Sequence, residues 1–186
     1  MKIALIGNGK GGEIAEYYLT HTPSEVPEIT FFGDTDKIPN GYKVLITFSK
    51  NMKRRREVYN QYIGRCTNLI LSNIKCKIGE NNFIFNNVTA GFKAKIGNNN
   101  VISSGVIINH HCTIGDGNLI GPGTVMSGSV TIGDNCNIGA GVTFEPGISI
   151  GDNSRIVSGA NVVQSLPKDS VRKAKVYNGV ITDFIC

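Results

Sequence analysis

The 186-residue chain has no tryptophan, few charged residues and no long apolar run. Charged residues make up only 18% of it, which is low for an ordinary globular surface. Five cysteines, an odd number without a CxxC pair, argue against a disulfide framework and a zinc knuckle. Neither a signal peptide nor a run of about 18 apolar residues is present, so we expect a cytoplasmic protein without a membrane span.

A large excess of one charge is also missing. The formal net charge is +5, and no stripe of Lys and Arg interleaves with aromatic residues. Nucleic acid is therefore not an expected partner, whereas small anionic ligands suit this charge. The basic run from Lys50 to Arg56 predicts the solvated face of a helix.

What the chain has is a repeat. Ile-Gly followed by Asn or an acidic residue recurs every 18 residues, and an apolar residue recurs every six within that period. A six-residue period fits neither an α-helix nor an ordinary strand but is typical of a parallel β-helix. The 18-residue period is carried by Ile78, Ile96, Ile114, Ile132 and Ile150.

Three hexads make one coil, and each hexad offers one large and one small inward residue. Regular coils, five or so, are predicted from Ile78 to about Leu166, and residues 66–167 form the predicted β-helix domain. Residues 18 apart should stack about 4.8 Å apart in neighbouring coils. The inward residues Asn82, Asn100 and Asn118 therefore predict a ladder of side-chain amides that bond one another.

The first 65 residues follow a different pattern. Strand, glycine turn, helix, two strands and helix predict a small α/β, Rossmann-like domain over residues 1–65. Gly7, Gly9 and Gly12 have the spacing of a loop that cradles a phosphate at a helix N-terminus, and Asp34 follows at the distance of a ribose-binding carboxylate. A tight turn kept for packing is the alternative. The unit is too small to favour NAD.

Histidine is rare, and two of the three histidines are adjacent. His110 and His111 fall on the outward part of a hexad, and the 18-residue step places Gly128 next to His110 in the following coil. A neutral imidazole can accept a proton, and a glycine N–H can donate to an oxyanion, so the pair predicts acyl-transfer chemistry. An inert surface pair is the alternative. Stepping 18 residues from either histidine reaches no metal ligand, so no metal is expected.

The hexads, the glycine-rich start and the segment 103–128 resemble the left-handed β-helix acyltransferases of the sugar O- and N-acetyltransferase group. The chain is most similar to nucleotide-amino-sugar N-acetyltransferases and to sialic-acid O-acetyltransferases. This resemblance implies a left-handed coil, acetyl-CoA as cosubstrate, and a homotrimer with active sites between subunits. It also implies that the N-terminal domain holds a nucleotide sugar.

The resemblance further implies roles for individual residues. The catalytic pair would be His110 as base and Gly128 as oxyanion donor. Substrate binding would fall to Gly7, Asn8, Gly9, Gly12, Asp34, Asp36, Ser103, Asn109 and His111. Acetyl-CoA would contact Leu119, Gly128, Gly141, Gly159, Arg172, Lys173 and Lys175, the last three in a C-terminal tail over residues 168–186.

The chain departs from the family at several of these positions. His111 stands where an acidic residue usually follows the catalytic histidine, and the tail lacks the usual Gly and Pro. The tail also ends in an apolar segment, 179–185, with no evident partner in the chain. Because an alkoxide needs a stronger base than an amine does, the missing carboxylate favours N-acetylation of a nucleotide-linked amino sugar in glycan biosynthesis. The alternatives are sugar O-acetylation and a non-catalytic β-helix trimer that binds a nucleotide sugar.

Overall fold

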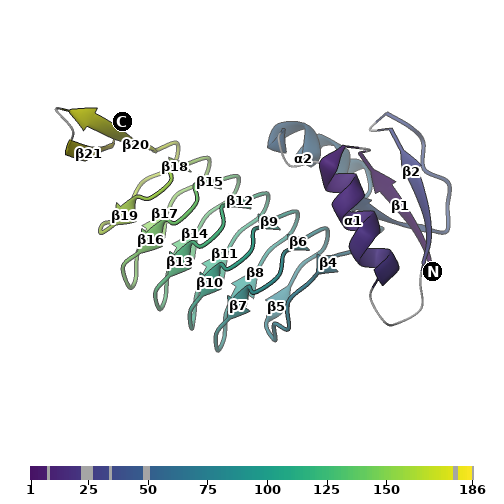
Figure 1. The fold of residues 1–186 in the computed structure, drawn as a ribbon, viewed down its shortest axis with the longest axis horizontal. Coiled ribbons are helices and arrows are strands. Elements are labelled where there is room, and N and C mark those ends of the chain that lie inside the picture. The colour runs from purple at the N-terminus through teal and green to yellow at the C-terminus, as the bar shows by residue number, and fades with distance from the viewer. Residues whose placement is uncertain (8, 22–26, 34, 48–50, 178–179, 186) are drawn as a thin grey trace.

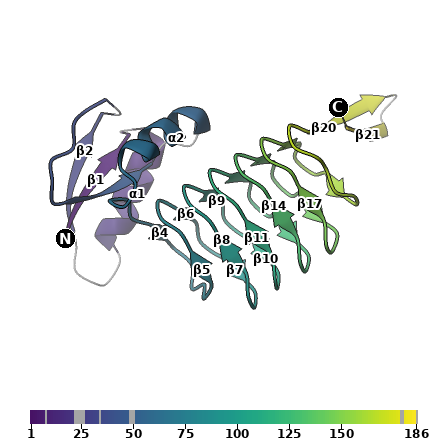
Figure 2. The ribbon, with the colours of Figure 1, turned by 180° about the vertical axis from the view of Figure 1, so that it is seen from behind.

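A computed structural model describes residues 1–7, 9–21, 27–33, 35–47, 51–177 and 180–185, with side chains as far as Arg172. A small α/β unit lies at one end of a stack of coils, and a C-terminal hairpin lies at the other (Figure 1 and, from behind, Figure 2). The prediction of a mainly β protein built on a parallel β-helix, with a minor N-terminal α/β part, is confirmed.

The N-terminal unit is a three-stranded parallel sheet with two helices. Its elements are β1 (Lys2–Ile6), α1 (Lys10–His21), β2 (Glu28–Phe32), β3 (Tyr42–Ile46) and α2 (Met52–Gln61). The order β2-β1-β3 places β1 in the middle, so the chain leaves β1 toward one side and returns on the other. Successive residues of β1 face opposite sides: Leu5 packs toward the β-helix, and Ile6 toward the Val58 side of α2.

The β-helix consists of two-residue strands in three parallel sheets, each named here after its first strand. The β4 sheet contains β4 (Leu69–Ile70), β6 (Phe83–Ile84), β9 (Val101–Ile102), β12 (Leu119–Ile120), β15 (Asn137–Ile138) and β18 (Arg155–Ile156), continued by β20 (Val171–Tyr177) and β21 (Val180–Ile185). The β5 sheet contains β5 (Lys77–Ile78), β8 (Lys95–Ile96), β11 (Thr113–Ile114), β14 (Thr131–Ile132) and β17 (Ser149–Ile150). The β7 sheet contains β7 (Thr89–Ala90), β10 (Ile107–Ile108), β13 (Val125–Met126), β16 (Thr143–Phe144) and β19 (Asn161–Val162).

Neighbouring coils pair in the register that the repeat predicts. Ile96 pairs with Ile114, and Ile114 with Ile132, along the β5 sheet. The Gly97 N–H donates to the Ile114 carbonyl at 2.8 Å, and equivalent bonds recur from coil to coil. The guide residues of the hexads form one continuous buried core. Hydrophobic burial inside the prism and the backbone ladder along it therefore support the same register.

The coil starts earlier than Ile78. Leu69 pairs with Phe83 in a step shorter than the 18 residues of the later coils. At the other end, β20 continues the β4 sheet by pairing with β18. The expectation that the segment 179–185 has no partner in the chain was wrong, because β21 pairs antiparallel with β20.

The asparagine ladder exists, but its bonds differ from the expectation. The Asn82 side-chain oxygen accepts from the Asn100 backbone N–H at 3.0 Å, and that of Asn100 accepts from the Asn118 N–H at 2.8 Å. The side-chain nitrogen of Asn100 donates to the Gly115 carbonyl at 3.0 Å. Each amide thus satisfies backbone groups at a corner, where the strands leave those groups unpaired.

The basic run before and within α2 is not a uniformly solvated face. Arg55 is fully buried, and its guanidinium donates to the Ile46 carbonyl and, at 3.0 Å, to the Asn81 carbonyl. Desolvation lowers the pKa of Arg55 to about 9. Asn81 also accepts from the Ile46 N–H at 3.1 Å. Arg55 and Asn81 therefore join the end of β3 to the first coils.

Within the described parts of the chain, neither helix is long and apolar enough to cross a bilayer.

Replacing Arg55 should weaken this joint. The Arg55→Leu variant leaves two buried carbonyls without their charged donor, so we expect the free energy of unfolding to fall by about 2–4 kcal/mol. Urea denaturation at matched protein concentration measures the change. Lys53→Leu, on the exposed side of the same helix, is the control and should change the value by less than about 0.5 kcal/mol. Equal stability of the two variants would contradict the assignment.

Candidate functional site

The His110 corner lies on the side of the prism away from the N-terminal unit. It follows β10 and precedes β11, so it joins the β7 and β5 sheets. In a three-sided prism this vertex is opposite the β4 sheet, and the N-terminal core packs on the β4 sheet through Phe83 and Val101. His110, His111 and Asn109 are all exposed there.

The His110 ring lies directly over Gly128, as the 18-residue step predicts. A Cβ built on Gly128 would lie 2.4 Å from Cε1 and 2.7 Å from Nε2 of His110. No side chain fits in that space without displacing the ring. Glycine at position 128 is therefore required for the imidazole to lie flat against the next coil.

The backbone N–H of Gly128 is open. At the Ile-Gly-Asp corners the equivalent N–H groups are capped by a side chain one coil on, as when the Asp116 N–H donates to the Asp134 carboxylate at 2.7 Å. One coil beyond Gly128 stands Pro146, which has no acceptor in its side chain. Among the hydrogen bonds of the described residues, none is donated by the Gly128 N–H. A free donor thus lies beside an imidazole, which is the arrangement that acyl transfer requires.

The two histidines contact each other. Their Nδ1 atoms are 3.1 Å apart, and the ring planes meet at 83°. The Asn109 side-chain oxygen accepts from the His110 N–H at 3.3 Å, so Asn109 supports the backbone of the corner. Phe92, one coil before His110, lies edge-on to the His111 ring.

Cys112 is a second possible nucleophile near this corner, but its surroundings argue against that role. It is buried, and its thiol donates to the Ser127 carbonyl at 3.0 Å. Burial raises the pKa of the Cys112 thiol. A thiol that stays protonated in the core is a poor nucleophile.

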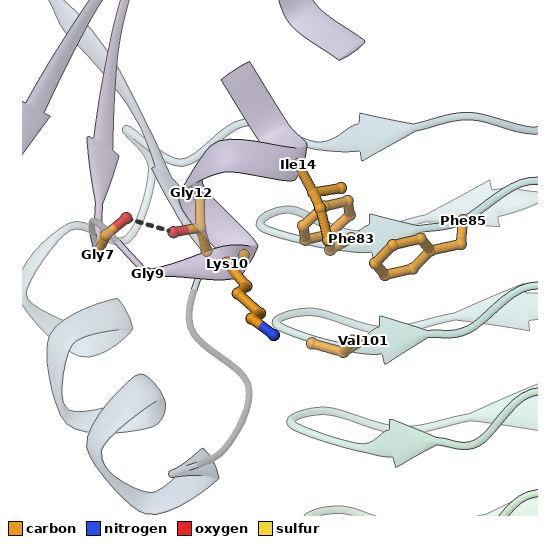
Figure 3. Close-up of a pocket in the computed structure, with 10 residues that line it drawn as sticks. Gly7, Gly9, Lys10, Gly12, Ile14, Phe83, Phe85 and Val101 are labelled. Atoms are coloured by element: carbon orange, nitrogen blue, oxygen red, sulfur yellow. Dashed lines mark hydrogen bonds between the residues drawn. The ribbon is translucent and has the colours of Figure 1, made fainter. Parts of the chain in front are cut away.

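The glycine-rich loop borders a cavity of about 380 Å³ between the N-terminal unit and the β4 sheet (Figure 3). Lys10 and Ile14 of α1 lie on one side, and Phe83, Phe85 and Val101 on the other. The loop follows the central strand β1, at the point where the chain direction around the sheet reverses. Open α/β sheets bind ligands at this position.

The glycines of the loop have different roles. Gly7 has a φ of 109°, which other residues avoid. A Cβ on Gly12 would lie 2.3 Å from the Gly7 carbonyl oxygen, and one on Gly11 would lie 2.2 Å from the Thr47 carbonyl oxygen. These glycines are required for packing. Gly9 differs, because a Cβ there would meet nothing within 4 Å. Of Gly9, Gly11 and Gly12, Gly9 is the one with room for a ligand.

Other predicted residues lie away from both places. Ser103 and Leu119 belong to the β4-sheet face, and Leu119 packs beside the cluster that joins the N-terminal unit to the coils. Gly141 and Gly159 are exposed corner residues with φ of 63° and 75°, a conformation that itself favours glycine. The Asp36 carboxylate accepts from the Gly33 N–H at 2.6 Å, which closes a local turn.

Some predicted residues, at both ends of the chain, are outside the described part of the structure. Asn8, Asp34 and the side chains of Lys173 and Lys175 are outside the described residues. Arg172 is inside, at the register position after Ile156, and is mostly buried. It lines a cavity of about 400 Å³ together with Arg155, which the sequence reasoning missed.

The sequence reasoning also missed the contact between the unit and the coils. The outward position before each guide residue of the β4 sheet is apolar in the early coils and polar later. This column reads Leu69, Phe83, Val101, Leu119, Asn137, Arg155. The first three are buried under the N-terminal unit. The change from apolar to polar residues was a usable signal for how far that unit reaches.

In the described part of the chain, no group of three or more His, Cys, Asp or Glu side chains could hold a metal ion.

Two segments of the chain, residues 93–128 and 129–164, match the family model described as bacterial transferase hexapeptide (six repeats). Residues 93–164 therefore carry the hexapeptide repeat that this model describes. The matched segments contain both His110 and Gly128. No curated protein matches the sequence.

Several solved structures share the fold. PerB from Caulobacter crescentus, in complex with CoA and GDP-perosamine, is 22% identical with a TM-score of 0.80, covering 92% of this chain and 93% of that one. The acetyltransferase domain of PglB from Neisseria gonorrhoeae, with acetyl coenzyme A, is 19% identical with a TM-score of 0.77, covering 92% and 95%. WeeI from Acinetobacter baumannii is 18% identical with a TM-score of 0.72, covering 99% and 100%.

The stack of His110 on Gly128 can be tested directly. In a Gly128→Ala variant the new methyl group occupies the space of the imidazole, so we expect a crystal structure to show the His110 ring rotated away from position 128. Because an exposed ring can move at little cost, the melting temperature should fall by no more than a few degrees. Ser127→Ala, beside it, is the control and should leave the ring in place. An unmoved ring in Gly128→Ala would contradict the description.

Proposed function

We propose that the chain is an acetyl-CoA-dependent N-acetyltransferase that acts on the amine of a nucleotide-linked amino sugar. The observation that carries this proposal is the His110 imidazole stacked on Gly128 beside an unoccupied backbone N–H. A proton acceptor and an oxyanion donor are the two groups that direct aminolysis of a thioester needs. The transferase hexapeptide match supports the same reading, as do the solved structures of PerB with CoA and GDP-perosamine and of the PglB acetyltransferase domain with acetyl coenzyme A.

The proposed reaction is a single transfer without a covalent enzyme intermediate. The substrate amine attacks the thioester carbonyl, a C–N bond forms, and His110 Nε2 takes the amine proton. The oxyanion accepts a hydrogen bond from the Gly128 N–H. When the carbonyl re-forms, the C–S bond breaks, and the proton held by His110 passes to the departing CoA sulfur.

The nucleotide end of the substrate is assigned to the cavity beside the glycine-rich loop. Backbone N–H groups at the start of α1 and the Lys10 ammonium suit a diphosphate. The planar faces of Phe83 and Phe85, stacked 4.5 Å apart, give that cavity an apolar wall. The domain division at 1–65, 66–167 and 168–186 follows these roles, with the tail near the CoA site.

The two places are on different sides of the coil in one chain, because the His110 corner lies opposite the β4 sheet. A substrate that occupies both would therefore bridge two copies of the chain. This supports the proposed homotrimer with active sites between subunits. We further propose that the protein acts in the cytoplasm. Arg155 and Arg172 would offer cations to the phosphates of CoA.

The activity is tested with acetyl-CoA and a panel of nucleotide-linked 4-amino sugars and their hydroxyl analogues, following release of free thiol. We expect turnover with an amino sugar, and a 10²–10⁴-fold lower kcat for His110→Ala. Unchanged turnover in that variant would remove His110 as the base. Turnover confined to the hydroxyl analogues would instead indicate O-acetylation. No release with any sugar would favour a binding protein.

Gly9→Val tests the nucleotide site separately. The position has open space, so the side chain should enter the cavity without disturbing the fold. We expect KM for the nucleotide sugar to rise by about tenfold or more, which corresponds to a loss of about 1.4 kcal/mol of binding free energy. KM for acetyl-CoA should stay the same. Val101→Ala, which enlarges the same cavity, is the matched comparison. Equal changes in both KM values would contradict this site.

A further inference from the structure

His110 and His111 share one hydrogen bond between like atoms. Their Nδ1 atoms are 3.1 Å apart, which is hydrogen-bond distance. A neutral imidazole carries its hydrogen on one nitrogen and a lone pair on the other. One Nδ1 must therefore donate and the other must accept, so the contact links the tautomers of the two rings.

The backbone holds His111 in place for this contact. Its φ is 60°, in the left-handed region where histidine is tolerated better than most residues. The His111 N–H donates to the Phe92 carbonyl at 2.8 Å, and the Phe92 ring lies edge-on to the imidazole. The same column in other coils holds Lys93, Ser129 and Gly147, also at positive φ. The corner therefore fixes the backbone and leaves the choice of side chain open.

The proposed base nitrogen depends on this bond. His110 Nδ1 is engaged by His111, which leaves Nε2 as the nitrogen available to a substrate. Nε2 has a lone pair only if the ring hydrogen is on Nδ1, and that hydrogen then needs an acceptor. In the described structure the side-chain partner of His110 Nδ1 is His111 Nδ1. No carboxylate has this position.

We propose that His111 is a positioning residue that holds His110 in the Nδ1–H tautomer, with its own hydrogen on Nε2. This inference rests on the proposed function, in which His110 Nε2 accepts the amine proton. When that proton arrives, the Nδ1–H···Nδ1 bond becomes charge-assisted and stronger. A neutral imidazole thus performs the orientation that a carboxylate performs in a Ser-His-Asp triad. His111 need not contact the substrate.

The tautomer can be read without any substrate. Protein labelled with 15N-histidine and carrying His21→Gln leaves two imidazoles to assign by long-range 1H–15N correlation near pH 8.5. We expect His110 in the Nδ1–H form and His111 in the Nε2–H form. In a His111→Gly variant, which suits the positive φ as Gly147 does, His110 should shift toward the Nε2–H form. His110 in the Nε2–H form in the parent protein would overturn the proposal.

Kinetics provide the second test. His111→Gly should lower kcat by about 10²–10⁴-fold with KM for acetyl-CoA unchanged, because a wrong tautomer costs about 10⁴-fold in a serine protease. His111→Asn restores an acceptor oxygen in a residue that this chain uses at other positive-φ corners, such as Asn99 and Asn135. It should recover kcat to within about tenfold of the parent. Equal kcat for the parent and His111→Gly would overturn the proposal.

The two tests separate the proposals. If the parent protein turns over no sugar, the proposed function fails, and the spectrum of the parent still decides the tautomer. If the parent is active and His111→Asn is as slow as His111→Gly although both keep the parent melting temperature, the positioning role is wrong while the function stands.

Discussion

The register between successive coils is the constraint on which the rest of the structure depends. Each coil donates its strand N–H groups to the next, and each guide residue stacks on its counterpart 18 residues away. A slip of one residue would turn the inward isoleucines outward and break every rung at once. Because this ladder has no tolerance for slips, it can place a side chain from one coil against the backbone of the next with atomic accuracy.

The candidate site uses that accuracy at one vertex. The Ile-Gly-Asp corners use their spare N–H groups on side chains from the following coil, as the Asp116, Asp134 and Asp152 series does. The vertex at Gly128 lacks such a cap, since proline follows one coil on, and the space that a side chain would fill holds the His110 ring. The site thus combines an uncapped N–H with a histidine ring, and the regular register between coils sets their geometry.

The fold and the core of the candidate site could be predicted from the sequence because both depend on the period. Spacing alone gave the pairing of Ile96 with Ile114 and the approach of His110 to Gly128. Spacing could not predict the contacts that the non-repeating segments make. The burial of Arg55, the cover over Phe83 and the pairing of β21 with β20 each depend on where non-repeating segments pack. The contact between His110 and His111 was missed for a different reason: the period does not say how sequence neighbours face each other at a corner, and His111 adopts a positive φ there.

Pro146 determines whether the Gly128 N–H at this vertex stays free to act as a donor. The side chains that cap the Ile-Gly-Asp corners are acceptors, and the group they cap is the same kind of N–H that Gly128 leaves open. With an aspartate or asparagine in place of Pro146, the side chain at position 146 would accept a hydrogen bond from the Gly128 N–H and cap it. The Gly128 N–H can either be capped by a side chain or serve as an oxyanion donor, but not both. Pro146 has no acceptor side chain and therefore leaves this N–H free.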